Sequence, residues 1–160
     1  MYRRRGGWGW ILACGGIVVL VAATIIPGLD GRHSRQRANE AAALGALKTV
    51  TALESKYTAA HPAQGFACEL PSLRPPDQAQ DADYNPLDFL VTRTHSGYKF
   101  ALGNCRADAS GVIAHYQATA VPAVRGETGF KAFCTDESGL LWYDAAGSAT
   151  DCLTSRRLLQ

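Results

Sequence analysis

The sequence predicts an α+β fold, in which a long N-terminal helix packs on a small antiparallel sheet of three or four strands. Three observations support this class. Residues 8–29 form an apolar run without a charge, apolar side chains recur at helical period over residues 34–61, and segments rich in aromatic and β-branched residues alternate with turn residues over residues 97–145. At 160 residues, the chain has room for one small domain.

The apolar run is long enough to cross a hydrocarbon core of about 30 Å as a helix. Three arginines at residues 3–5 precede it, and Trp8 and Trp10 stand beside them, where indoles favour the headgroup region. We therefore expect a cytoplasmic basic leader over residues 1–7 and a transmembrane segment over residues 8–29. Residues 30–160 would then form an exported domain, held by a single pass in the inner membrane.

A cleavable signal peptide is the main alternative for this terminus. The small residues that end at Ala23 would suit cleavage, and the mature chain would then begin at Thr24. A lipoprotein signal built on Cys14 fits less well, because the apolar run continues well past that cysteine. A retained segment is the interpretation that we adopt.

The stretch after the apolar run is predicted to be a helix over residues 34–61. Its apolar stripe is narrow and rich in small residues, which suits close packing along a sheet. Pro62 follows His61 and ends the pattern. The stripe comprises Ala43, Ala46, Leu47, Val50, Leu53 and Tyr57.

The remaining residues divide into a loop, a meander and a tail. Prolines and a polar run make residues 62–96 a variable loop, with one short helical turn near residues 87–91. Four strands are then predicted, separated by turn residues. They cover residues 97–105, 111–121, 129–136 and 139–145, and a C-terminal tail over residues 146–160 follows.

Cysteine usage indicates an oxidising compartment. Outside the apolar run the chain holds an even set of four, Cys68, Cys105, Cys134 and Cys152, as expected for two disulfides. Buried free thiols in a cytosolic domain are the alternative. Zinc is disfavoured because no CxxC or HxxxH pair is present. Four cysteines allow three pairings, and the sequence alone does not choose among them.

Charge and motifs favour no catalytic or nucleic-acid role. The net charge is +2, without a basic patch that carries interleaved aromatic residues, so nucleic acid is a poor candidate partner. No nucleophile elbow or phosphate-binding loop occurs, and we expect no enzyme activity, cofactor or metal. The four histidines, His33, His61, His95 and His115, are scattered and are interpreted as surface or turn residues.

Four acidic residues near the C-terminus, Asp136, Glu137, Asp144 and Asp151, lack the spacing of an EF-hand loop. They are interpreted as solvated acids in turns.

Taken together, these segments resemble the type IV pilin and pseudopilin family. The likeness rests on the basic start, the apolar run that ends in "IIP", and "RANEAAALGALKTV" directly after it. It continues in "GFACELPSL", "SGYKFAL" and "FCTDESGLLWYD". The resemblance implies a membrane-anchored subunit of a pilus or of a type II secretion filament. In this family the membrane segment and the domain helix are one continuous helix, which first anchors the subunit in inner-membrane lipid and later packs against other subunits.

The resemblance also implies roles for residues in the first segment. Gly7 and Trp8 stand where a prepilin peptidase would cut, although residues 8–29 lack the glutamate that usually follows. Pro27 would kink the helix, because proline removes a backbone donor and clashes with the preceding turn. Small residues allow close helix packing. They are Gly9, Ala13, Gly15, Gly16, Ala22 and Ala23.

The disulfide pairing and the alternative function complete the expectations. The strand order favours Cys134 with Cys152, which would clip the tail to the sheet much as the family staples its terminal loop, and leaves Cys68 for Cys105. The alternative function is a disulfide-stabilised binding module or enzyme, secreted or tethered, with a ligand site in residues 63–96. It would form no filament.

Overall fold

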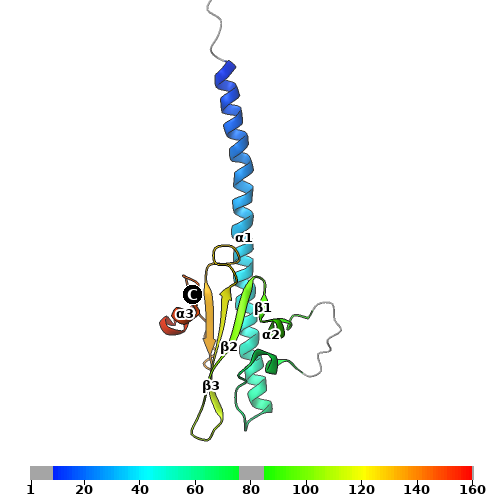
Figure 1. Cartoon of the computed structure of the whole chain (residues 1–160), viewed down its shortest axis with the longest axis vertical. Helices are drawn as coiled ribbons and strands as arrows, with labels where there is room; N and C mark the ends of the chain where they lie inside the picture. Colours follow the sequence, from blue (N-terminus) through cyan, green and yellow to red (C-terminus); the bar gives the residue numbers. More distant parts are fainter. Residues whose placement is uncertain (1–8, 76–84, 160) are drawn as a thin grey trace, which may run out of the picture. The chain divides into compact units, whose positions relative to one another are not determined.

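A computed structural model describes the backbone of residues 9–75 and 85–159, and the side chains of residues 31–75 and 85–159. The chain divides into two compact units, residues 1–35 and residues 36–160. Helix α1 (Gly9–Ala60) contributes to both units, and the described strands lie in the second (Figure 1). The predicted α+β class, with an N-terminal helix and an antiparallel sheet, is therefore confirmed.

Residues 36–60 of α1 pack on one face of the sheet through the predicted stripe. Five of its six side chains are buried, and Tyr57 is partly buried against the same core. The sheet supplies large aromatic side chains to this core, of which Tyr98, Tyr116 and Phe133 are almost fully buried. Full burial of a large apolar side chain contributes about 1.5 to 3 kcal/mol, so this helix face is a main source of stability.

The sheet has five antiparallel strands in chain order. They are β1 (Thr94–His95), β2 (Tyr98–Ala107), β3 (Ile113–Pro122), β4 (Ala132–Asp136) and β5 (Trp142–Asp144). The register pairs Phe100 of β2 with Ala120 of β3, and Ala120 with Phe133 of β4. These partners share one face because side chains alternate along a strand, and that face contacts α1.

The fifth strand, β1, adds one strand to the predicted meander. It pairs with the start of β2 through a two-residue turn at Ser96 and Gly97, whose φ angles are 47° and 72°. Two successive residues in the left-handed region are typical of a tight hairpin turn. With only two residues, β1 is too short to leave a periodic pattern in the sequence.

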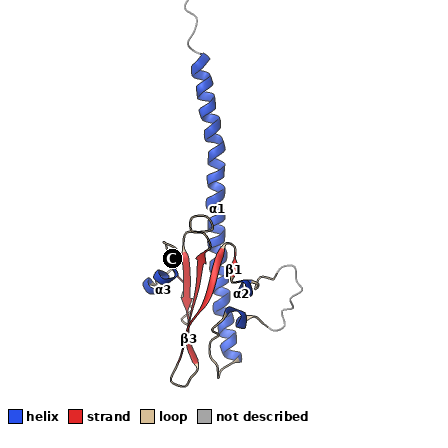
Figure 2. Ribbon diagram, viewed as in Figure 1, coloured by secondary structure: helices blue, strands red, loops and turns tan. Residues whose placement is uncertain are grey.

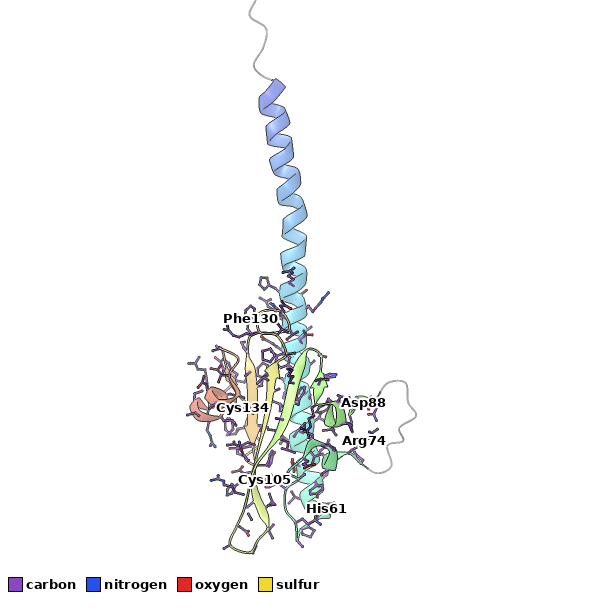
Figure 3. All side chains as sticks on the ribbon, viewed as in Figure 1. His61, Arg74, Asp88, Cys105, Phe130 and Cys134 are labelled. Atoms are coloured by element: carbon purple, nitrogen blue, oxygen red, sulfur yellow. A yellow bond between two sulfur atoms is a disulfide. The ribbon has the colours of Figure 1, made fainter. Side chains whose placement is uncertain are left out.

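Two short helices close the core beside β1. They are the 3-10 helix η1 (Leu70–Leu73) and helix α2 (Phe89–Thr92). Each buries two apolar side chains in the core that α1 forms with the sheet. Helix α2 lies close to the helical turn predicted at residues 87–91. Arg74 and Asp88 form an ion pair of 4.0 Å between the two segments, and Figure 3 labels both residues.

A third short helix, α3 (Ala149–Ser155), lies near the opposite edge of the sheet, beside β4 and β5 (Figure 2). Its N-cap is Ser148, whose hydroxyl accepts a hydrogen bond of 3.2 Å from the Asp151 amide. The following residues turn back along β5, where the Tyr143 amide donates to the Arg157 carbonyl at 2.9 Å. This segment covers part of an edge strand that would otherwise be open.

The expected placement as a single-pass protein of the inner membrane with an exported domain is corrected. Among the residues that the structure describes, none of the helices combines the length and the apolarity needed to cross a membrane.

Candidate functional site

The structure contains two disulfides, so the prediction of disulfide bonds is confirmed. One joins Cys68, which precedes η1, to Cys105 of β2. The other joins Cys134 of β4 to Cys152 of α3. These are the two pairs that the strand order and the pilin resemblance favoured. Figure 3 labels Cys105 and Cys134, one from each pair.

The residues predicted for processing and helix packing stay predictions. Gly7 and Trp8 lie outside the described residues. Pro27 and the small residues lie in the part of α1 whose backbone is described and whose side chains are not. That part contains Gly9, Ala13, Gly15, Gly16, Ala22 and Ala23.

A polar cleft of about 460 Å³ lies in the second unit, where β2, β3 and the end of β4 meet the end of α3. His115 and Gln117 of β3 line it and alternate with Tyr116 and Ala118, which are buried in the core under α1. Because side chains alternate along a strand, the two polar residues belong to the face of the sheet that turns away from α1. The cleft is therefore the candidate site on that face.

A break in the β2–β3 pairing shapes one wall of the cleft. Gly103 pairs with Gln117, whereas the next partner pair is Arg106 with His115. Asn104 lies inside this irregularity with a φ of 50°. Its side-chain Nδ2 donates a hydrogen bond to Gln117 Oε1 at 2.8 Å. Bulges of this kind turn side chains away from the regular ladder. Here the bulge places polar groups from both strands along one wall.

His115 and Glu137 form the closest ion pair of the cleft. The His115 Nδ1 atom lies 2.7 Å from Glu137 Oε1, and the two side chains are 45% and 32% exposed. Partial burial raises the pKa of Glu137, but the hydrogen bond from His115 and two backbone hydrogen bonds outweigh it, and the pKa lies below its usual value. Glu137 thus stays ionised and orients the imidazole ring.

Asp136 and Arg156 form a second pair in the cleft. Arg156 Nη2 lies 3.0 Å from Asp136 Oδ2, while Oδ1 accepts hydrogen bonds from the amide and the hydroxyl of Ser138. Asp136 is only 3% exposed. The interpretation as a solvated turn acid is therefore wrong for Asp136, because its carboxylate is enclosed by the turn between β4 and β5 and by the end of α3.

Most of the residues that line the cleft are polar or charged. Asp136 pairs with Arg156 and Glu137 pairs with His115, whereas the side chain of Arg106 makes no hydrogen bond or ion pair within the described residues. The structure brings no serine, threonine or cysteine nucleophile into contact with His115 through a described hydrogen bond. Among the described residues, no three His, Cys, Asp or Glu side chains gather as metal ligands would.

Sequence reasoning missed a polar connection between α1 and the loop before β4. Three side chains on one side of α1 bind the backbone of residues 126–131. Gln36 Nε2 donates to the Gly126 carbonyl at 2.6 Å, Asn39 Nδ2 donates to the Thr128 carbonyl at 2.8 Å, and Glu40 Oε1 accepts from the Phe130 amide at 3.0 Å. The only signal was polar residues at helical spacing before the apolar stripe.

Comparison with known proteins adds no relative. No family model matches the chain, and neither a curated protein nor a solved structure matches it.

Proposed function

We propose that the chain is a pilin-like or pseudopilin-like subunit that assembles with other such subunits through the N-terminal part of α1. The observation that carries the proposal is the composition of this one helix. From Gln36 to Ala60 it packs on the sheet of its own domain, whereas residues 9–29 are uncharged and belong to the other unit. Packing against the helix of another subunit would bury the surface of such an uncharged segment.

The choice of partner follows from residue size. Six of residues 9–23 are Gly or Ala, and small residues of this kind let helices approach closely. A second copy of the same helix is a partner of matching length and chemistry. The pilin resemblance supports this assignment, because helix packing is how that family builds filaments. The Cys134–Cys152 bond ties α3 to the sheet, as the family's terminal staple does.

Cys14 offers a direct test, because the other four cysteines are paired. Mild oxidation of the full chain should link copies through Cys14 if their helices pack together. Gly16→Leu, two residues away, should reduce the linked dimer severalfold by separating the helices.

Gly31→Leu is the matched control, since a Cβ at Gly31 meets no atom within 4 Å and the residue lies beyond the apolar run. Cys14→Ser should remove the linked dimer. Equal yields from Gly16→Leu and Gly31→Leu would contradict the proposal.

A second candidate is a binding module, and the polar cleft favours it. Its ligand would contact Arg106 and Gln117, not residues 63–96 as the sequence alternative supposed. Titration of the labelled protein with sugars and short peptides, followed by amide NMR, tests this. Shifts around Arg106 that disappear in Arg106→Ala, but not in Lys99→Ala on the same strand, would support a binding role. An unchanged spectrum would count against it.

A further inference from the structure

Glu54 is a carboxylic acid enclosed in the core that α1 forms with the sheet. Its side chain is fully buried, and it stands between Val50 and Tyr57 on the face of α1 that packs inward. The Oε2 atom accepts a hydrogen bond of 2.9 Å from the Ala67 amide. Glu54 therefore connects α1 to the segment that leads into the Cys68–Cys105 disulfide.

The other oxygen of this carboxyl, Oε1, has no hydrogen-bond partner among the described residues. The same holds for the buried hydroxyl of Thr58, one helical turn further on and so on the same side of α1. A buried carboxylate with one hydrogen bond is poorly solvated, whereas the neutral acid loses much less on burial. The geometry thus favours the protonated form in the packed state.

Among the residues that the structure describes, no cationic group pairs with the Glu54 carboxyl. Tyr116 faces it from β3 and is itself buried, and Tyr57 lies three residues along α1. Asp136 and Glu137, beyond Tyr116, are both acidic. In residues 61–68 the one side chain that can carry a positive charge is His61, which is exposed and stacks on Tyr57. Burial raises the pKa of Glu54 from 4.5 to about 7, and the Ala67 hydrogen bond lowers it only in part.

The segment that Glu54 holds is also attached to the sheet. Phe66 and Ile113 are joined by a hydrogen bond of 3.0 Å from the Phe66 amide to the Ile113 carbonyl. Beyond Ala67, the disulfide fixes Cys68 to β2. The segment can therefore separate from α1 at Ala67 and stay tethered to the sheet, so a local opening does not require the domain to unfold.

We propose that Glu54 is a pH-responsive latch, which holds the segment Gly65–Cys68 on α1 while protonated and releases Ala67 when the carboxyl ionises and reaches water. This inference goes beyond the proposed function and does not depend on it. Between the ordinary pKa of the carboxyl, which applies to the open state, and its raised pKa in the latched state, the latched state binds one more proton than the open state. Opening therefore becomes easier as the pH rises through that interval and changes no further above it.

Hydrogen exchange at the Ala67 amide measures the latch directly. Opening increases by close to tenfold for each pH unit inside the interval, so the protection factor should fall by about 300-fold in total from well below pH 4.5 to well above pH 7, and by about 80-fold between those two values. Glu54→Gln keeps an acceptor for the Ala67 amide but carries no titrating proton, and its protection factor should stay level. Glu69→Gln is the matched control, because Glu69 is an exposed glutamate directly after this segment and its replacement should leave the fall in protection unchanged.

A measurement on the unmodified protein keeps the test decisive if Glu54→Gln does not fold. The side-chain carboxyl carbon of Glu54, observed by NMR, should report a neutral acid at about pH 5 and titrate near neutrality. A carboxyl already ionised at about pH 5, or an Ala67 protection factor that stays level in the wild-type protein, would overturn the proposal. An equal fall in Glu54→Gln and in the wild-type protein would also overturn it.

Discussion

The two faces of the sheet are stabilised in different ways. The face toward α1 carries a large apolar cluster that includes side chains from α1, η1, α2 and three strands. The face toward α3 has only a small cluster of Cys134, Trp142 and Cys152, beside the polar cleft. Buried apolar area therefore stabilises the first face, whereas a covalent bond and paired charges hold the second.

The two faces therefore differ in how well they tolerate amino-acid substitutions. The α1 face holds the core on which folding depends, whereas the α3 face can be substituted more freely. A packed apolar face tolerates few substitutions, because any lost volume leaves a cavity. The α3 face carries the polar cleft, and the Cys134–Cys152 bond keeps α3 in place beside it. A ligand-binding or partner-specific surface can vary on that face without removing the core.

Leu47→Ala should have the largest effect, because it tests the α1 face. Leu47 is fully buried, and its truncation should lower the free energy of unfolding by about 3 to 5 kcal/mol through lost burial and an unfilled cavity. Urea denaturation followed by far-UV circular dichroism measures this. The adjacent Lys48→Ala is the control, since Lys48 is exposed and should cost less than about 0.5 kcal/mol. Similar losses of unfolding free energy in both variants would contradict the conclusion that buried apolar area stabilises the α1 face.

The α1 face was largely predictable from the sequence, because its signals are local and periodic. The stripe of α1 repeats at helical period, and β2 to β4 are long enough for aromatic and β-branched residues to mark them. Glu54 is the exception on this face. A glutamate in a helix is ordinarily taken as solvent-exposed, and only the position of Ala67 in space shows that it is buried.

The α3 face was mostly not predictable, because its contacts depend on register and on short elements. His115 and Glu137 are 22 residues apart and meet only through the pairing of β3 with β4. Helix α3 has seven residues and one buried side chain, Cys152, which leaves no amphipathic pattern. The signals that identified this face were the even number of cysteines and the predicted strand order, which together favoured the Cys134–Cys152 bond.

Removal of the Cys134–Cys152 bond tests the second face and should have a smaller effect than Leu47→Ala. The two cysteines are 18 residues apart, and replacing both with alanine should cost about 3 kcal/mol in the chain-entropy model. Hydrogen exchange of α3 should rise more than that of α1, because α3 has little other apolar contact. Thr150→Ala, an exposed site on the same helix, is the control. Uniform loss of protection in both helices would show that the two faces do not unfold separately.

The smallest expected effect concerns the His115–Glu137 pair in the cleft. Both side chains are about a third or more exposed, so a double-mutant cycle with His115→Ala and Glu137→Gln should give a coupling of about 0.2 to 1 kcal/mol. The pKa of Glu137 is lowered in the folded state. Its contribution to the free energy of unfolding is therefore fully present above the ordinary carboxyl pKa and disappears as the pH falls through the lowered pKa.

The coupling should therefore be measurable at about pH 6, vanish in acid below the folded pKa of Glu137, and shrink in about 1 M salt, where screening is strong. Urea denaturation of the four proteins of the cycle at each condition gives these values. Glu127→Gln, an exposed glutamate in the loop before β4, provides the control, since it makes no ion pair within the described residues. A coupling above about 2 kcal/mol, or one that persists in acid, would mean that the pair is enclosed like a core contact. The two faces of the sheet would then be less different in their stabilisation than their apolar clusters indicate.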